Sequence, residues 1–124
     1  MKRPEQQLQI ACVRLAAVIV PHVVLWATPN GGYRTKAEAG ILKAMGAVQG
    51  VPDLCCVLPQ GGIGFLELKA PKGKLSPAQI QFRERVEDWG ALWAEIRTIE
   101  DFERTLRAWF PRERFLGTIL KGQP

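Results

Sequence analysis

This sequence of 124 residues contains one histidine and three cysteines, and it has no C-x-x-C motif. Zinc sites are built from several Cys and His side chains at short spacings, so this composition argues strongly against one. An odd number of cysteines, two of them adjacent at Cys55 and Cys56, gives no disulfide framework and fits a reducing compartment. We interpret the cysteines as small core residues, and His22 as a residue at the end of a helix.

Long hydrophobic runs are also missing. The longest apolar stretch, residues 15–27, is interrupted by Pro21 and His22 and falls short of the ~20 residues that a membrane-spanning helix requires. Polar side chains between Glu5 and Gln9 interrupt the region where a secretory signal peptide would be apolar. We therefore expect no membrane span and no signal peptide.

The residues that are present are typical of a folded protein, because 47% are hydrophobic and no repeat is visible. At this length we expect one domain over residues 1–124, with a core at about 4–110 and a loosely held tail at 111–124. Apolar periodicity and capping residues predict helices at 4–20, 36–45, 77–89 and 99–109, and strands at 23–28, 53–58, 63–69 and 92–97. The expected fold class is α/β, with a mixed central sheet flanked by helices on both faces.

The aromatic residues give a first list of core candidates. The continuous apolar run at 23–28 predicts a buried strand. We expect core or helix–sheet packing for Trp26, Phe82, Trp89, Trp93 and Phe102. Aromatic residues near the end of the chain could instead form an exposed surface for a partner, and this alternative stays open for Trp109, Phe110 and Phe115.

Three charged residues stand at the ends of two predicted strands. Asp53 opens one apolar run, and Glu67 and Lys69 close the next. Residues two apart on a strand point to the same face, and pairing through the turn at 59–62 would bring Asp53 to that face. Two carboxylates beside an ammonium group can bind Mg²⁺ or Mn²⁺ and hydrolyse a phosphodiester.

A simpler interpretation of these three residues is a solvated sheet face with a weak ion pair. The flanking residues favour a functional site. A glycine-containing turn at 50–52 precedes Asp53, a basic loop at 70–74 follows Lys69, and Ser76 and Pro77 are typical of a helix start.

An Asp followed by Glu-x-Lys on the next strand resembles the PD-(D/E)xK nucleases. The surrounding sequence is similar to the VRR-NUC branch of that superfamily over roughly residues 4–98. The matching elements are a first helix with Glu5 and Gln9, the segments 29–32, 50–53, 67–69 and 75–79, and Arg34. The resemblance implies a PD-(D/E)xK restriction-endonuclease-like fold and a metal-dependent DNA endonuclease in the cytoplasm of a bacterial or phage-infected cell.

The resemblance also implies roles for individual residues. Mg²⁺ or Mn²⁺ would be held by Asp53, Glu67 and the backbone carbonyl of Leu68, and through water by Glu5. Lys69 would orient or deprotonate the attacking water, and Gln79 matches a glutamine near the family's active site.

Charge along the chain points to a polyanionic partner. Residues 29–83 contain seven Lys or Arg and only three acids, whereas residues 84–124 contain seven basic and eight acidic residues. Phosphates attract such a basic region, although an ordinary surface excess of charge would look similar. Candidate phosphate contacts are Asn30, Arg34, Lys72 and Lys74.

The expected partner is DNA, bound by a homodimer that cuts branched substrates such as four-way junctions. Three alternatives remain at this level. The protein could be a nuclease acting on flaps or ends, a non-catalytic nucleic-acid-binding module that keeps the nuclease fold, or a basic assembly subunit.

Overall fold

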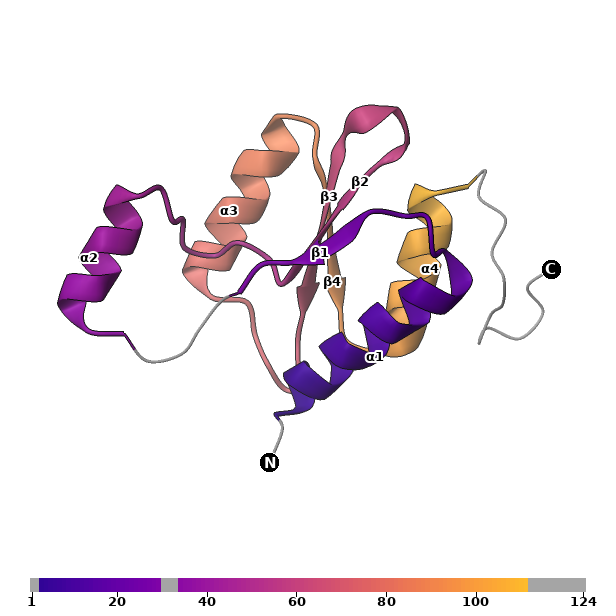
Figure 1. Cartoon of the computed structure of the whole chain (residues 1–124), viewed down its shortest axis with the longest axis horizontal. Coiled ribbons are helices and arrows are strands. Elements are labelled where there is room, and N and C mark those ends of the chain that lie inside the picture. Colours follow the sequence, from indigo (N-terminus) through magenta and orange to yellow (C-terminus); the bar gives the residue numbers. More distant parts are fainter. Residues whose placement is uncertain (1–2, 30–33, 112–124) are drawn as a thin grey trace.

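The computed structural model describes residues 3–29 and 34–111 (Figure 1). Their order is α1 (Pro4–Ile19), β1 (Leu25–Ala27), α2 (Lys36–Ala44), β2 (Leu54–Val57), the 3₁₀ turn η1 (Pro59–Gly61), β3 (Ile63–Leu68), α3 (Pro77–Asp88), β4 (Leu92–Ile96) and α4 (Ile99–Trp109). Every helix and strand predicted from the sequence is confirmed, and α4 has the predicted bounds. The predicted caps are confirmed as well, because the hydroxyls of Thr35, Ser76 and Thr98 each accept a backbone N–H of the first helical turn.

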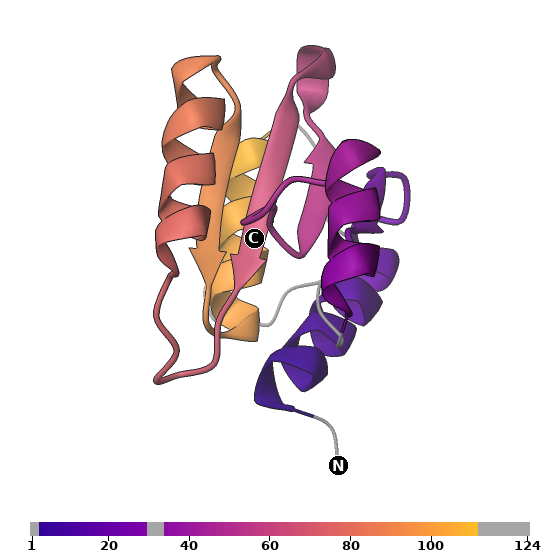
Figure 2. The ribbon, with the colours of Figure 1, turned by 90° about the vertical axis from the view of Figure 1, so that its left-hand side faces the viewer.

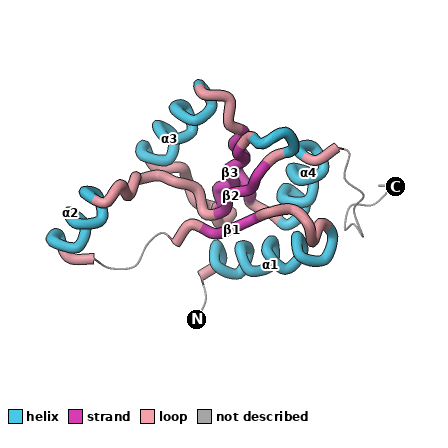
Figure 3. The backbone as a smooth tube through the Cα atoms, turned by 45° about the horizontal axis from the view of Figure 1, so that its top comes forward, coloured by secondary structure: helices cyan, strands magenta, loops and turns pink. Residues whose placement is uncertain are grey.

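The four strands form one mixed sheet in the order β1-β2-β3-β4. β1 and β2 are antiparallel, β2 and β3 are antiparallel, and β3 and β4 are parallel. β2 and β3 are joined by the tight turn predicted at 59–62, where Gln60 takes a positive φ of 75°. Figure 3 shows this sheet in the middle of the fold, with helices around it.

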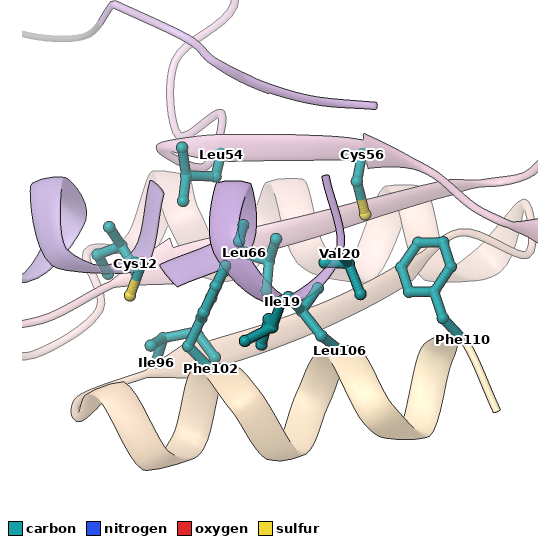
Figure 4. Packing of buried hydrophobic residues seen from close by; sticks show 12 residues of the cluster. Cys12, Ile19, Val20, Leu54, Cys56, Leu66, Ile96, Phe102, Leu106 and Phe110 are labelled. Atoms are coloured by element: carbon teal, nitrogen blue, oxygen red, sulfur yellow. The ribbon is translucent and has the colours of Figure 1, made fainter. Parts of the chain in front are cut away.

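Helices cover both faces of the sheet (Figure 2). On one face, α1 and α4 enclose the hydrophobic core, in which Leu66, Ile96 and Phe102 are completely buried (Figure 4). On the other face, Phe82 of α3 packs edge-to-face on Phe65 of β3, with ring centroids 5.2 Å apart. The predicted α/β class with a mixed sheet and helices on both faces is therefore confirmed.

Two of the aromatic core predictions are wrong. Trp26 is 43% exposed and Trp89 is 93% exposed, whereas Trp93 and Phe102 are buried. The prediction that the first strand is buried is also wrong. β1 has three residues, lies at the edge of the sheet, and has two exposed positions, Trp26 and Ala27.

The aromatic residues at the end of α4 belong to the core. Phe110 is buried and Trp109 packs against the core cluster. The Trp109 ring covers Gly64, where an added Cβ would lie 2.5 Å from the ring. A partner surface made of these two aromatics is therefore excluded, and Phe115 and the predicted tail from residue 112 lie outside the described residues.

Helix α2 has no buried residue; α3 has none either, but Phe82 of α3 packs on the sheet. Figures 1 and 3 show α2 standing apart from the sheet. It exposes Ile41, and its C-cap residue Met45 is 78% exposed. The N-cap bond of Thr35 and a carboxylate in the first turn at Glu38 account for a helix here without tertiary packing.

Candidate active site

The register of β2 and β3 brings Asp53 to the end of β3. Leu54 pairs with Leu66 in the antiparallel ladder, so the residue before Leu54 lies beside Glu67. The Asp53 carboxylate accepts a hydrogen bond of 2.9 Å from the backbone N–H of Leu68, and its backbone carbonyl accepts one of 2.9 Å from Thr28. Asp53 is therefore fixed by backbone groups on both sides.

Glu67 and Lys69 are buried, with exposed fractions of 3% and 8%. A solvated face with a weak ion pair is thus excluded. Charged side chains are rarely placed in the interior unless a partner or a function compensates the cost of removing them from water. The two residues share the β3 face that α3 covers, as their alternation with Leu66 and Leu68 predicts.

Gln79 connects Glu67 to the start of α3. Its side-chain carbonyl accepts a hydrogen bond of 2.8 Å from the N–H of Ser76, and the Ser76 hydroxyl accepts one of 3.2 Å from the N–H of Gln79. This reciprocal capping box leaves the amide NH₂ free to donate to Glu67 Oε2 at 3.3 Å. The same residue therefore caps a helix and orients the carboxylate.

The loop before Asp53 lies directly against this first turn of α3. Gly50 has a φ of 82°, and a Cβ on it would lie 2.3 Å from the carbonyl oxygen of Ala78 and 2.9 Å from the nitrogen of Gln79. Only glycine fits both this conformation and this contact. Gly50 thus keeps the segment leading to Asp53 in fixed contact with the segment that carries Gln79.

The other carboxylate oxygen of Glu67, Oε1, is buried and has no hydrogen-bond partner among the residues that the structure describes. The pKa of Glu67 is raised to about 9, chiefly by burial and then by the negative charge of Asp53 and a hydrogen bond with it, while the charge of Lys69 opposes these causes. A buried oxygen without a partner, next to a second carboxylate, is the arrangement that a hard cation satisfies.

Glu5 approaches the same place from the first turn of α1. Its charge also raises the pKa of Glu67, and it lines with Asp53 a cavity of about 710 Å³. Within the described residues, no three Cys, His, Asp or Glu side chains are grouped closely enough to form a ligand set by themselves. A cation here would therefore need backbone or water ligands beside the pair of carboxylates.

The residues predicted to contact phosphate differ in their distance from the site. Lys72 and Lys74 are exposed on the loop that follows Lys69, so they border the site. Arg34 is exposed just before α2, and no contact among the described residues joins it to the site. Asn30 lies outside the described residues.

Arg97 was not predicted from the sequence. Its guanidinium donates hydrogen bonds of 2.9 Å and 3.2 Å to the carbonyls of Ala70 and Pro71, and it pairs with Glu95. It therefore holds the start of the basic loop against the end of β4. A basic residue directly after a strand was the available signal, but only the parallel pairing of β3 and β4 brings it to this loop.

The protein has an α/β fold with a carboxylate pair, a buried lysine and a glutamine at one end of a mixed sheet. This combination defines a class of protein, that of the nuclease-like α/β folds. The profile of the VRR-NUC domain matches residues 4–98, so the chain belongs to the VRR-NUC domain family. This is a nuclease family, which makes DNA the substrate class.

Solved structures agree with this assignment. The chain is similar to a structure described as a VRR_NUC domain protein, with a TM-score of 0.71, 17% identity, and coverage of 97% of this chain and 98% of that one. Another, described as a VRR_NUC domain, gives a TM-score of 0.59, 21% identity, and coverage of 88% and 100%. At these identities the structures support the fold alone. Among curated proteins, none matches the chain.

Proposed function

We propose that this protein is a metal-dependent DNA endonuclease that hydrolyses phosphodiester bonds at the site formed by Asp53, Glu67 and Lys69. The observation that carries the proposal is the buried Glu67 carboxylate, whose Oε1 has no partner and which lies beside Asp53. Placing a buried carboxylate beside a second, half-buried one is unfavourable without a cation, so a structural role alone does not explain them.

Asp53 and Glu67 supply the hard oxygen ligands that Mg²⁺ or Mn²⁺ prefers, with the Leu68 carbonyl as a further ligand and Glu5 acting through water. A bound ion would neutralise phosphate oxygens and lower the pKa of a water molecule. Gln79 holds Glu67 in position through its amide.

Lys69 is proposed to act on the water and on the developing charge. Its side chain is buried beside Glu67, and its stem runs past Gly73, where an added Cβ would lie 3.6 Å from Lys69 Cδ. A buried ammonium group is weakly screened, so it orients the attacking water and stabilises negative charge in the transition state. In its neutral form the same group accepts the proton of that water.

The direct test is cleavage of supercoiled plasmid in the presence of Mg²⁺ or Mn²⁺, with a chelator as the control. Nicked and linear DNA should appear only with the metal. If the wild-type protein binds DNA but leaves it uncut with either ion, it is a non-catalytic module that keeps the nuclease fold.

The preferred substrate is proposed to be branched DNA, with the four-way junction first among the candidates. The chain shows no helix-turn-helix or zinc module, so strong sequence specificity is not expected. One active site cuts one strand, and a two-fold dimer presents two sites at a fixed separation to a substrate of the same symmetry.

A homodimer is supported by apolar side chains that the protomer leaves uncovered. Ile41 and Met45 of the α2 region and Trp89 after α3 are strongly exposed, and a second copy would remove them from water. Light scattering and cleavage of matched junction, flap and duplex oligonucleotides test both parts. A monomer that cuts all three equally well would contradict the dimer and the junction preference together.

None of the described helices combines the length and apolar character needed to cross a bilayer.

A further inference from the structure

The basic loop at 70–74 follows Lys69 and leads to the first turn of α3, and the chain is fixed at both of these ends. The N–H of Lys69 donates a hydrogen bond of 2.9 Å to the carbonyl of Ile96, and Ser76 shares a capping box with Gln79. Figure 2 shows the segment between β3 and α3 extending beyond the end of the sheet. None of the loop residues is buried, so packing in the core does not hold the loop.

The hydrogen bonds that reach the loop from other parts of the described chain both come from Arg97. Its Nη1 donates to the carbonyl of Ala70 at 2.9 Å and to the carbonyl of Pro71 at 3.2 Å. The carbonyl of Ala70 also accepts the N–H of Gly73 at 2.9 Å, which closes the loop into a turn. Arg97 therefore fixes this turn at its first two residues.

Arg97 is itself held by the elements on either side of it. Its Nε pairs with the carboxylate of Glu95, and its backbone N–H donates a hydrogen bond of 3.0 Å to Asp101. The same Asp101 carboxylate accepts the N–H of Thr98 at 3.1 Å in the capping box of α4. Because a guanidinium group is a planar fork, these contacts leave it little freedom. Arg97 thus ties the loop to α4, which packs in the core.

The order of this turn bears on DNA binding because it carries Lys72 and Lys74, which are both exposed. A lysine on a disordered loop would have to order its backbone when it binds a phosphate, and the lost conformational entropy weakens binding. A loop that is ordered beforehand avoids this loss. The bound contacts are the same in both cases, so ordering the loop changes the affinity but not the number of counterions released.

We propose that Arg97 is a positioning residue for DNA binding, because it orders the turn that presents Lys72 and Lys74 to the phosphates. The inference rests on the proposed nuclease function, in which this loop faces the DNA. It concerns phosphates alone, so it applies to a fully paired four-way junction. A direct phosphate contact by Arg97 is the competing explanation, since its side chain is 33% exposed.

The test variant combines Arg97→Met with Glu95→Gln, which removes one charge of each sign and leaves the net charge at +5. The order of the loop is measured first, without DNA, by trypsin cleavage of the native protein after Lys72 and Lys74. Cleavage after Arg104 in α4 measures unfolding of the whole protein, and loop cleavage is taken relative to it. The variant should be cut in the loop faster than the wild type, because proteases cut mobile exposed segments.

DNA affinity is then measured by fluorescence anisotropy on a labelled four-way junction at several salt concentrations, with chelator present so that no hydrolysis occurs. The test variant should bind about tenfold more weakly than the wild type, the effect of ordering one more loop residue on binding, with the same salt slope. In protein that already carries Lys72→Ala and Lys74→Ala, the same change should weaken binding by about twofold or less, because no lysine is left to position.

The matched control is Arg83→Met with Glu87→Gln, which removes another exposed ion pair and lies within α3. This control should keep both the loop cleavage and the DNA affinity of the wild type. Three results would overturn the inference: unchanged loop cleavage in the test variant, unchanged DNA affinity, or an equal loss of affinity with and without the two lysines. The third result with a salt slope lower by about 0.9 would identify a direct phosphate contact by Arg97.

These results are separate from the failure of the proposed function. A protein that cuts DNA with metal but binds it independently of Arg97 loses only this inference. A protein whose DNA binding depends on Arg97 in the expected way, but which never cuts, loses only the nuclease.

Discussion

At the end of strand β3, Leu66 and Leu68 point to one face, and Glu67 and the next residue after the strand, Lys69, point to the other; all four are less than a tenth exposed. The leucines lie in the core with α1 and α4, where burial removes apolar surface from water and stabilises the fold. The charged pair lies under α3, where burial removes charge from water and costs stability. The apolar side chains of this strand therefore stabilise the folded state, whereas burial of its charged side chains lowers the stability.

The difference explains how a chain of this size can carry the proposed site. The core cluster is continuous from α1 through the sheet to α4, so the fold does not depend on the polar face. The polar face is held by specific contacts, chiefly the Asp53–Leu68 hydrogen bond and the capping box of Gln79. We therefore expect mutations on the two faces to affect different properties, in the order given below.

The largest effect is expected for cleavage on the polar face. Glu67→Gln keeps the shape of the side chain and removes its charge, and it should lower the cleavage rate by about 10³-fold. Its thermal midpoint in chelator should stay the same or rise, because burying Glu67 at neutral pH requires either a buried charge or the uptake of a proton, and Gln requires neither. Cleavage kinetics and thermal unfolding of the same preparation check both statements.

Asp53→Asn and Lys69→Ala separate the loss of metal binding from the loss of cleavage. Both should lose cleavage, but Asp53→Asn should also weaken Mn²⁺ binding in calorimetry, whereas Lys69→Ala should keep it. Wild-type rates in any of the three variants would show that the polar face is not the reactive site.

A change on the apolar face should have the opposite pattern. Leu66→Ala leaves a cavity in a fully buried position and should lower the free energy of unfolding by about 2–5 kcal/mol. Urea denaturation measures the loss, and cleavage per folded molecule should stay close to that of the wild type. If Leu66→Ala is as stable as the wild type but does not cleave DNA, the two faces do not control stability and cleavage separately.

The pH dependence of stability should distinguish the faces as well. The pKa of Glu67 is about 9 in the folded protein and about 4.5 in the unfolded chain, so the folded state binds the proton more tightly. Its contribution to stability is present in full below pH 4.5 and is lost as the pH rises through 9. In chelator, wild type should therefore lose stability between these values relative to Glu67→Gln. Parallel stability curves would contradict this expectation.

The smallest effect is expected at the exposed basic loop. Lys72→Ala combined with Lys74→Ala should weaken DNA binding and reduce its salt slope by about one for each lost phosphate contact. Cleavage at saturating DNA should change less than affinity. The matched control is Lys36→Ala with Lys43→Ala, which removes the same charge from α2. If both double variants behave alike, the loop does not face the substrate.

The site was predictable from the sequence to the extent that it depends on neighbouring strands. Asp53, Glu67 and Lys69 were located because a short turn forces β2 and β3 to pair and the side chains of a strand alternate. Arg97 was not located, because it reaches its place through a long-range contact, the parallel pairing of β3 and β4.

The sequence by itself determined the helices, the strands and their caps, since these follow from periodicity and from residues such as Thr35, Ser76 and Thr98 within a few positions. Only the tertiary structure decided which side chains lose contact with water. It buried Glu67 and Lys69, left Trp89 exposed, and brought Arg97 to the basic loop. The physical reason is that burial depends on which distant element covers a residue, and no local pattern in the chain carries that information.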